Sequence, residues 1–255
     1  LHVYTLPTGD WGKKGAATGF PEAEWASTMK RTLRMADVIE DQKAILKKHD
    51  LPADAFGLYV DEWGMWVDQD EATDPPALYQ QGSIRDAIVA GLNLNLFHAH
   101  ADVVKMTNIA QMVNVLQAMI LTDGPDMVLT PTYHVFDMYQ PFMSAEALEM
   151  NLQSPDYVFG DVTVPAISAS AARTEDSRIV LALVNASAHD DHLVDASAFG
   201  ASKATGRILQ GEEMDSHNTF DGPDRVQPAP YIVDGTADDL VLSIPARSVV
   251  VVTLD

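Results

Sequence analysis

Two adjacent carboxylates, Asp61 and Glu62, are the residues of this sequence whose type and setting could perform chemistry. They follow the apolar run at residues 56–60 and stand close to Trp63 and Trp66. An ionised carboxylate can act as a nucleophile or a general base, and a protonated one can act as a general acid. Tryptophans beside a carboxylate can stack on sugars, although tryptophans of a protein core look the same in a sequence.

The geometry of a strand limits what this pair of carboxylates can do. Retaining glycoside hydrolysis needs two carboxyl groups about 5 Å apart, on either side of the scissile bond. Consecutive strand residues point to opposite faces, so we expect only one of Asp61 and Glu62 to reach a site. A simpler interpretation of Glu62 is a carboxylate that caps the strand or pairs with a surface cation. The local pattern leaves both interpretations open.

The elements that must position these residues alternate between short strands and long helices up to about residue 120, which predicts βα units around a parallel sheet. We expect strands at residues 1–5, 56–60 and 103–111, and helices at residues 21–49, 78–98 and 112–120. Three such units are part of an eight-stranded barrel, whose active site lies at the C-terminal ends of the strands. The polar residues at those ends are His2, Tyr4, Glu62, Asn108 and Gln111.

In the rest of the chain the apolar residues follow a different spacing. Short apolar runs bounded by Gly, Pro, Asp and Ser predict an all-β sandwich. We expect strands at residues 127–130, 162–169, 178–185, 206–209, 240–244 and 248–254. The predicted fold is therefore α/β plus all-β, with a barrel part at residues 1–120 and a sandwich domain at residues 121–255.

The composition excludes several classes of partner. The 255 residues include 37 acidic and 16 Lys or Arg residues, which give a formal net charge of −21. We therefore expect no nucleic acid and no membrane as a partner, because both attract concentrated positive charge. A solvated surface explains the acidity equally well. The absence of cysteine removes disulfides and thiolates, and it is compatible with the cytoplasmic location that we expect.

We expect no metal and no cofactor. His98, His100 and Asp102 have residue types that bind metals, but residues two apart on a helix do not share a face. The sequence also has no Gly-rich phosphate loop, nucleophile elbow or HExxH pattern. The methionines at residues 106–119 are interpreted as core fillers.

An ordered series of motifs resembles the C-terminal half of the family 51 α-L-arabinofuranosidases. Its members are Val60-Asp61-Glu62-Trp63-Gly64, Leu78-Tyr79-Gln80-Gln81, Ile84-Arg85-Asp86-Ala87, His100-Ala101-Asp102, Val104-Lys105-Met106, and the segments at 108–117, 119–124 and 129–139. The five-residue motif is weak alone, whereas the ordered series is highly specific. The resemblance covers residues 1 to about 140, and beyond them the chain agrees with the family only in its β character.

The resemblance implies the last three βα units of a (β/α)8 TIM barrel, followed by a β-sandwich of jelly-roll type. It implies a retaining enzyme that releases terminal α-L-arabinofuranosyl groups from arabinan, arabinoxylan or their oligosaccharides. By the family pattern Glu62 is the nucleophile. The residues implied to bind the sugar are His2, Tyr4, Trp66 and Gln111, with Gln117 as the alternative to Gln111.

One departure from the family concerns the second carboxylate. The acid/base Glu of the family follows an Asn on an earlier barrel strand, and these 255 residues lack that segment. We therefore expect an incomplete enzyme that pairs with the N-terminal half of the same enzyme, in a homo-oligomer that by resemblance is a hexamer. The alternatives are a non-catalytic carbohydrate-binding fragment and a glycosidase of other specificity, such as a xylosidase or an endoglucanase.

Overall fold

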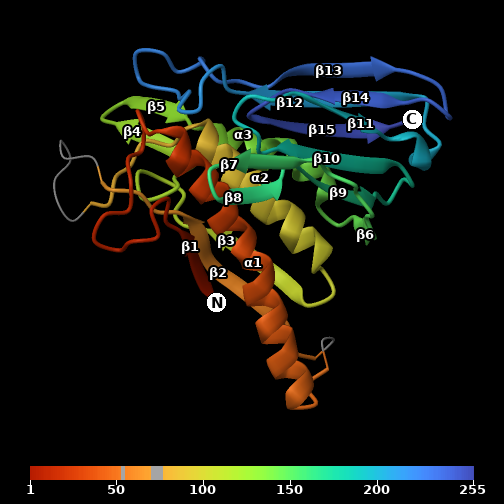
Figure 1. Cartoon of the computed structure of the whole chain (residues 1–255), viewed down its shortest axis with the longest axis horizontal. Helices are drawn as coiled ribbons and strands as arrows, with labels where there is room; N and C mark the ends of the chain where they lie inside the picture. Colours follow the sequence, from red (N-terminus) through yellow and green to blue (C-terminus); the bar gives the residue numbers. More distant parts are fainter. Residues whose placement is uncertain (53–54, 70–76) are drawn as a thin grey trace.

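The computed structural model describes residues 1–52, 55–69 and 77–255. It is rich in sheet and has few helices. Figure 1 shows the N-terminal strands and a long helix at one end of the molecule, and broad antiparallel strands at the other. None of the helices in the described part of the chain is long and apolar enough to cross a membrane.

The first part is a parallel sheet with the strand order β1-β2-β3. The strands are β1 (His2–Thr5), β2 (Leu58–Met65) and β3 (Val104–Ile109), and the helices between them are α1 (Glu22–Lys48) and α2 (Ile84–Ala99). The predicted βαβαβ order is confirmed. Helix α2 begins six residues later than expected, because the Ser83 hydroxyl and the Asp86 carboxylate form a capping box there.

Strand β2 is longer than predicted and contains a bulge. It continues to Met65 instead of ending at the two carboxylates. From Val60 to Trp63 it advances by three residues while β3 advances by two, from 107 to 109. Val60 and Trp63 are both completely buried, whereas Asp61 and Glu62 between them are accessible. The strict alternation by which we limited the site to one carboxylate is therefore broken at this point.

The helix predicted at residues 112–120 does not form. The chain turns back on itself instead, with positive φ angles of 58° at Asn114 and 53° at Leu116. The carbonyl oxygen of Met112 accepts hydrogen bonds from the N–H groups of Met119 and Ile120. The next elements are a hairpin of β4 (Ile120–Asp123) and β5 (Asp126–Leu129), and then helix α3 (Pro131–Met138) in a region predicted to hold only strands.

The second part is an antiparallel sheet with the strand order β13-β12-β15-β10-β9-β6. Its strands are β6 (Glu146–Leu148), β9 (Ile167–Arg173), β10 (Ile179–Asn185), β12 (Lys203–Gln210), β13 (Ala229–Asp234) and β15 (Ser248–Leu254). Two separate pairs are β7 (Asp156–Phe159) with β8 (Val162–Pro165), and β11 (His192–Asp195) with β14 (Val241–Ile244). The predicted strands in this region form, although the one predicted at residues 162–169 divides into β8 and the start of β9. Strands β4, β6, β7, β11 and β13 were not predicted.

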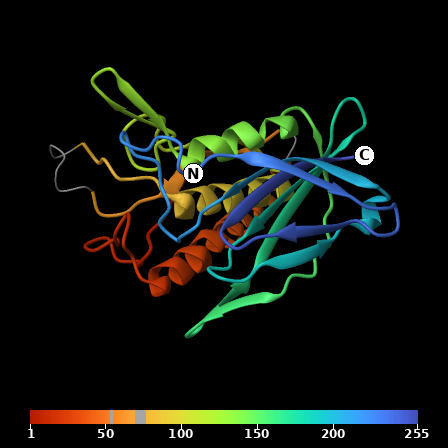
Figure 2. The same cartoon turned by 90° about the horizontal axis from the view of Figure 1, so that it is seen from above.

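The antiparallel sheet is buried on both faces. Along β10, Val180, Ala182 and Val184 share a core with α1 and α2, whereas Leu181 and Leu183 share a core with β11 and β14. Figure 2 shows the helices on one side of the blue strands. Because the helical core draws on residues from both predicted domains, the boundary near residue 120 crosses a continuous core, and it stays a prediction.

Candidate active site

Both carboxylate oxygens of Glu62 have a partner on β1. The pairing of β1 with β2 places His2 directly opposite Glu62. The Tyr4 hydroxyl donates a hydrogen bond to Oε1 of Glu62, and Nδ1 of His2 lies 2.8 Å from Oε2. The Glu62 side chain still has 31% of its surface exposed, so a ligand can reach it. The structure thus brings together three of the predicted site residues.

The surroundings of Tyr4 keep its hydroxyl protonated, so that it donates a hydrogen bond to Glu62. Its partial burial, followed by the hydrogen bond and the charge of Glu62, raises its pKa well above the usual value. The hydroxyl therefore stays protonated through the neutral range and holds Oε1 in one orientation. A carboxylate fixed in this way loses little freedom when it attacks an electrophile.

Aromatic side chains form a wall beside this carboxylate. Trp66 follows β2, and its backbone N–H donates to the carbonyl oxygen of Thr5 at 3.0 Å. Its ring lies edge-on to Tyr4, with centroids 5.0 Å apart, and edge-on to Trp11, with centroids 5.4 Å apart. The ammonium of Lys14 lies 5.4 Å from the Trp66 centroid. We name Tyr4, Trp66 and Trp11 the aromatic wall.

Sequence reasoning missed Trp11. It lies in the loop after β1, and 62% of its surface is exposed. The available signal was its place in a loop at the C-terminal end of a parallel strand, where barrel enzymes carry functional residues. Trp63, in contrast, faces the core, edge-on to Phe97 at 5.2 Å and stacked on Phe136 at 6.1 Å. Of the two tryptophans beside the carboxylates, only Trp66 is placed to meet a ligand.

The two candidate glutamines lie in different environments. Gln111 is exposed after β3, and its side chain makes no hydrogen bond to any described residue. Gln117 is completely buried. Its Oε1 accepts from the N–H of Met65 at 2.5 Å, and its Nε2 donates to the carbonyl oxygen of Asp86 at 2.7 Å. Gln117 therefore joins the end of β2 to α2, while the sugar contact assigned to Gln111 stays a prediction.

The backbone conformation near the end of β2 requires a glycine at position 64. Its φ is +142°, a conformation that side chains rarely adopt, and a Cβ there would lie 3.0 Å from Oε1 of Gln117. Gln80 completes the support of this segment, because its amide accepts from the N–H of Val67 at 2.9 Å and donates to the carbonyl oxygen of Met65 at 3.0 Å. These contacts fix the backbone that carries Glu62 and Trp66.

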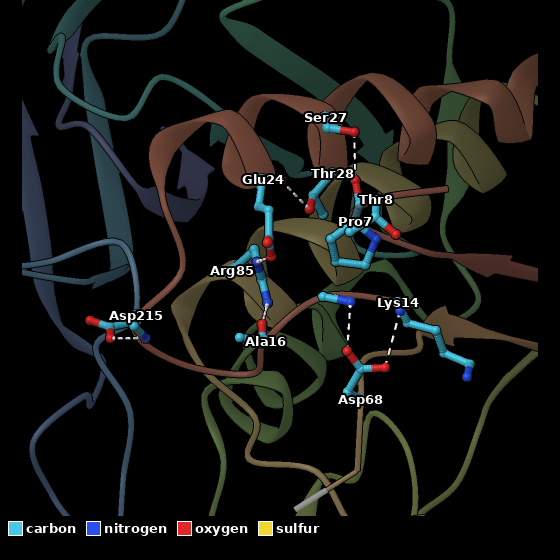
Figure 3. A network of polar contacts seen from close by, with 12 residues as sticks. Pro7, Thr8, Lys14, Ala16, Glu24, Ser27, Thr28, Asp68, Arg85 and Asp215 are labelled. Atoms are coloured by element: carbon cyan, nitrogen blue, oxygen red, sulfur yellow. Dashed lines mark hydrogen bonds and ion pairs between the residues drawn. The ribbon is translucent and has the colours of Figure 1, made fainter. Parts of the chain in front are cut away.

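A polar network holds the loop that carries Trp11 (Figure 3). The carboxylate of Asp68 accepts from the N–H groups of Lys14 and Gly15 at 3.0 and 3.1 Å. The guanidinium of Arg85 donates to the carbonyl oxygen of Ala16 at 2.5 Å. Arg85 is completely buried, which lowers its pKa to about 10, so it keeps its charge at neutral pH.

The two histidines considered as metal ligands have separate partners. His98 is hydrogen-bonded through Nδ1 to Ser170 at 2.9 Å and stacks on Phe142 at 4.5 Å. Nδ1 of His100 lies 3.4 Å from a carboxylate oxygen of Glu40. Within residues 1–52, 55–69 and 77–255, no group of three or more His, Cys, Asp or Glu residues is arranged to hold a metal ion.

Comparisons with known proteins show the family of this chain. The α-L-arabinofuranosidase C-terminal domain matches residues 61–248. An intracellular exo-α-L-arabinofuranosidase of Bacteroides ovatus is 40% identical over 261 residues, which cover 100% of this chain and 50% of that protein. This chain belongs to the α-L-arabinofuranosidase C-terminal domain family. The resemblance seen in the sequence is therefore confirmed.

A solved relative has the same fold as this chain. The GH51 arabinofuranosidase from Xanthomonas axonopodis pv. citri is 43% identical, with a TM-score of 0.94 over 100% of this chain and 52% of that one. An exo-α-(1→5)-L-arabinofuranosidase of Bacillus subtilis is 28% identical over 48% of this chain and 26% of its own length. The chain spans about half the length of the first two relatives.

Proposed function

We propose that this chain carries the nucleophile of a retaining α-L-arabinofuranosidase that releases terminal α-L-arabinofuranosyl residues from arabinan or arabinoxylan oligosaccharides. The observation that supports this most directly is the setting of Glu62, whose two oxygens are held by Tyr4 and His2 while its side chain stays accessible. In this mechanism Glu62 attacks the anomeric carbon, and the leaving oxygen takes a proton from a second carboxyl group. Water then hydrolyses the glycosyl-enzyme.

The neighbours of Glu62 support the same reaction. Tyr4 and His2 orient the carboxylate, and its negative charge stabilises the positive charge that develops at the anomeric carbon. Trp66 offers an apolar face against which a sugar ring can pack, within the aromatic wall. Gln111 is proposed to reach the sugar from the loop after β3. The chemistry needs no cofactor.

The second carboxyl group is proposed to come from an N-terminal segment of the same enzyme. Support comes from the relatives, which are about twice as long as this chain. In this arrangement β1, β2 and β3 are the last three strands of a (β/α)8 barrel over residues 1–120, and residues 121–255 form a jelly-roll sandwich. The assembled enzyme is proposed to be a hexamer in the cytoplasm, and the relative from Bacteroides ovatus is named intracellular.

Covalent labelling tests the assignment of the nucleophile. A mechanism-based fluorinated arabinofuranoside should label Glu62 of the assembled enzyme, as located by peptide mass spectrometry. Glu62→Gln should abolish both the labelling and the turnover of an aryl α-L-arabinofuranoside, with a loss of roughly 10⁴-fold or more in kcat. Asp61→Asn is the matched control, because its carboxylate is bonded to neither Tyr4 nor His2. A label on any other carboxylate would contradict the proposal.

The same turnover assay, repeated with aryl xylosides and β-glucans as substrates, separates the alternatives. An enzyme that prefers aryl xylosides or β-glucans would be a glycosidase of other specificity. A protein that binds arabino-oligosaccharides without cleaving them would be a carbohydrate-binding module.

A further inference from the structure

Asp68 joins the loop after β1 to the segment after β2 by three hydrogen bonds. Its carboxylate accepts from the N–H groups of Lys14 and Gly15, one at each oxygen, at 3.0 and 3.1 Å. Its own N–H donates to the carbonyl oxygen of Gly15 at 2.9 Å. Hydrogen bonds to an ionised carboxylate are stronger than those between neutral groups. Asp68 therefore connects two loops that are more than fifty residues apart in the chain.

This connection reaches the aromatic wall through Lys14. The ammonium of Lys14 donates to the carbonyl oxygen of Trp11 at 3.0 Å and lies over the Trp66 ring. The carbonyl oxygen of Lys14 accepts from the N–H of Thr8 at 3.2 Å, which closes the loop around Trp11. The position of the Trp11 ring therefore depends on a backbone that Asp68 holds.

The other contacts of this loop are hydrogen bonds within it and at its start, where Arg31 of α1 donates to the carbonyl oxygen of Thr8 at 3.2 Å. Trp11 is largely exposed, so burial contributes little to its placement. Gly15 has a φ of +111°, and a Cβ there would lie 2.7 Å from a carboxylate oxygen of Glu24, so this position of the loop requires a glycine. Figure 3 shows Asp68 beneath Lys14, and Arg85 pointing at Ala16 from the other side. Asp68 and Arg85 hold the loop at residues 14–16, after Trp11, whereas Arg31 holds it at Thr8, before Trp11.

We propose that Asp68 is a positioning residue that determines how well the enzyme binds the part of the substrate beyond the arabinofuranosyl group. It keeps Trp11 against Trp66, so that the two rings form one surface beside Glu62. Both carboxylate oxygens of Asp68 are occupied by backbone N–H groups, so the residue acts through Trp11 and not by touching the sugar. This inference rests on the proposed function.

Substrates with and without a leaving-group sugar test the inference in the assembled enzyme. In Asp68→Ala, KM for an arabino-oligosaccharide should rise about tenfold, whereas kcat for α-L-arabinofuranosyl fluoride should change by less than about twofold. The fluoride has no sugar beyond the arabinose, so the position of Trp11 does not affect it. Asp238→Ala is the matched control, because Asp238 is an exposed turn residue of the β region. It should leave both substrates unchanged.

A double-mutant cycle asks whether Asp68 acts through Trp11. Trp11→Ala alone should raise KM for the oligosaccharide, and adding Asp68→Ala should raise it by less than about twofold more, because the two residues act as a unit. Multiplied effects in the double variant, or equal losses on both substrates, would overturn the inference. If Asp68→Ala does not fold, as judged by circular dichroism, Asp68→Asn replaces it, because its side chain keeps one acceptor oxygen. Asp68→Asn should raise KM for the oligosaccharide by a smaller factor and leave kcat for the fluoride unchanged.

The two proposals fail in different ways. If the unsubstituted enzyme cleaves neither substrate, the proposed function is wrong. If it cleaves both and the Asp68 variants match Asp238→Ala, the proposed function stands and the inference about Asp68 is wrong.

Discussion

The two sheets of this molecule differ in regularity. Strand β10 pairs with β15 and with β9 over seven residues on each side without a register shift. Strand β2 pairs with β3 over a shorter length with two register shifts, one of them at the carboxylates. The regular sheet buries both of its faces, while the irregular one leaves polar side chains accessible. Regular pairing provides stability here, and the candidate site lies where pairing is interrupted.

If this division is correct, core substitutions in the antiparallel sheet should change stability alone. Leu181 is 1% exposed in the core between β10 and the β11–β14 pair. Leu181→Ala should lower the free energy of unfolding by about 3 kcal/mol, because it leaves a cavity. Urea unfolding measures this change. Leu193→Ala, at a side chain that is 74% exposed, is the control and should cost less than about 0.5 kcal/mol. A loss of kcat in folded Leu181→Ala would break the comparison.

The contact between the two parts should be sensitive to acid. Burial lowers the pKa of His98 from 6.5 to about 4, and the residue connects α2 to Ser170 of β9. Between these pH values the unfolded chain binds a proton that the folded chain does not. The contribution of neutral His98 to stability is therefore complete above pH 6.5 and is lost as the pH falls toward 4, by up to about 3 kcal/mol.

Unfolding measured across this pH range tests the prediction. His98→Gln should flatten the change in unfolding free energy between pH 6.5 and 4. His49→Gln, at an exposed position just after α1, should leave the slope as it is in the unsubstituted protein. An unchanged slope in His98→Gln would mean that other groups cause the acid sensitivity.

Removing one hydroxyl from the irregular sheet should change activity and not stability. Tyr4→Phe deletes the donor to Oε1 of Glu62. We expect kcat/KM on an aryl arabinofuranoside to fall about 10- to 100-fold, while the melting temperature stays the same. Tyr59→Phe is the control on β2, because its ring is half-exposed and no hydrogen bond to its hydroxyl is seen among the described residues. Equal effects of the two variants would remove Tyr4 from the site.

The smallest expected effect is at Gly64, where stability and activity should change together. Gly64→Ala places a Cβ at a φ of +142° and close to Gln117. We expect a loss of about 1–2 kcal/mol in unfolding free energy, together with lower kcat, because the backbone that carries Glu62 shifts. Gly82→Ala meets only ordinary contacts at 3.4 Å and is the control. A Gly64→Ala variant as active and as stable as the unsubstituted protein would show that the end of β2 tolerates side chains.

The elements with a strong period were predictable from the sequence. The apolar spacing before Lys48 predicted α1, and the valine-rich run at the C-terminus predicted β15, because each pattern reports a buried face. The edge strand β6 was not predicted, because its three residues have too little apolar content to give a signal. Strand β13 is mostly apolar, but Pro230 within it argues against a strand. The helix expected at residues 112–120 was wrong because tertiary hydrogen bonds, including those of Gln117, decide that segment.

The site was predictable in part. The pairing of His2 and Tyr4 with Glu62 agrees with their expected places on neighbouring strands. The bulge was not predictable, because nothing in the residue types around Asp61 marks an extra residue in the ladder. Trp11 was missed because its position beside Trp66 depends on a loop conformation to which Asp68 and Gly15 both contribute.

The bulge in β2 also separates two stretches of the strand that can change differently in evolution. Deleting one residue at Asp61 would restore an even ladder with β3, in which Trp63 still stands opposite Ile109 and on the same face as Val60. Inserting or deleting a residue between Glu62 and Met65 would instead shift the pairing with β1 and turn the following side chains to the opposite face. Related chains should therefore keep the number of residues from Glu62 to Met65, even where the residues themselves differ, whereas a change of length is easier to accommodate at the bulge.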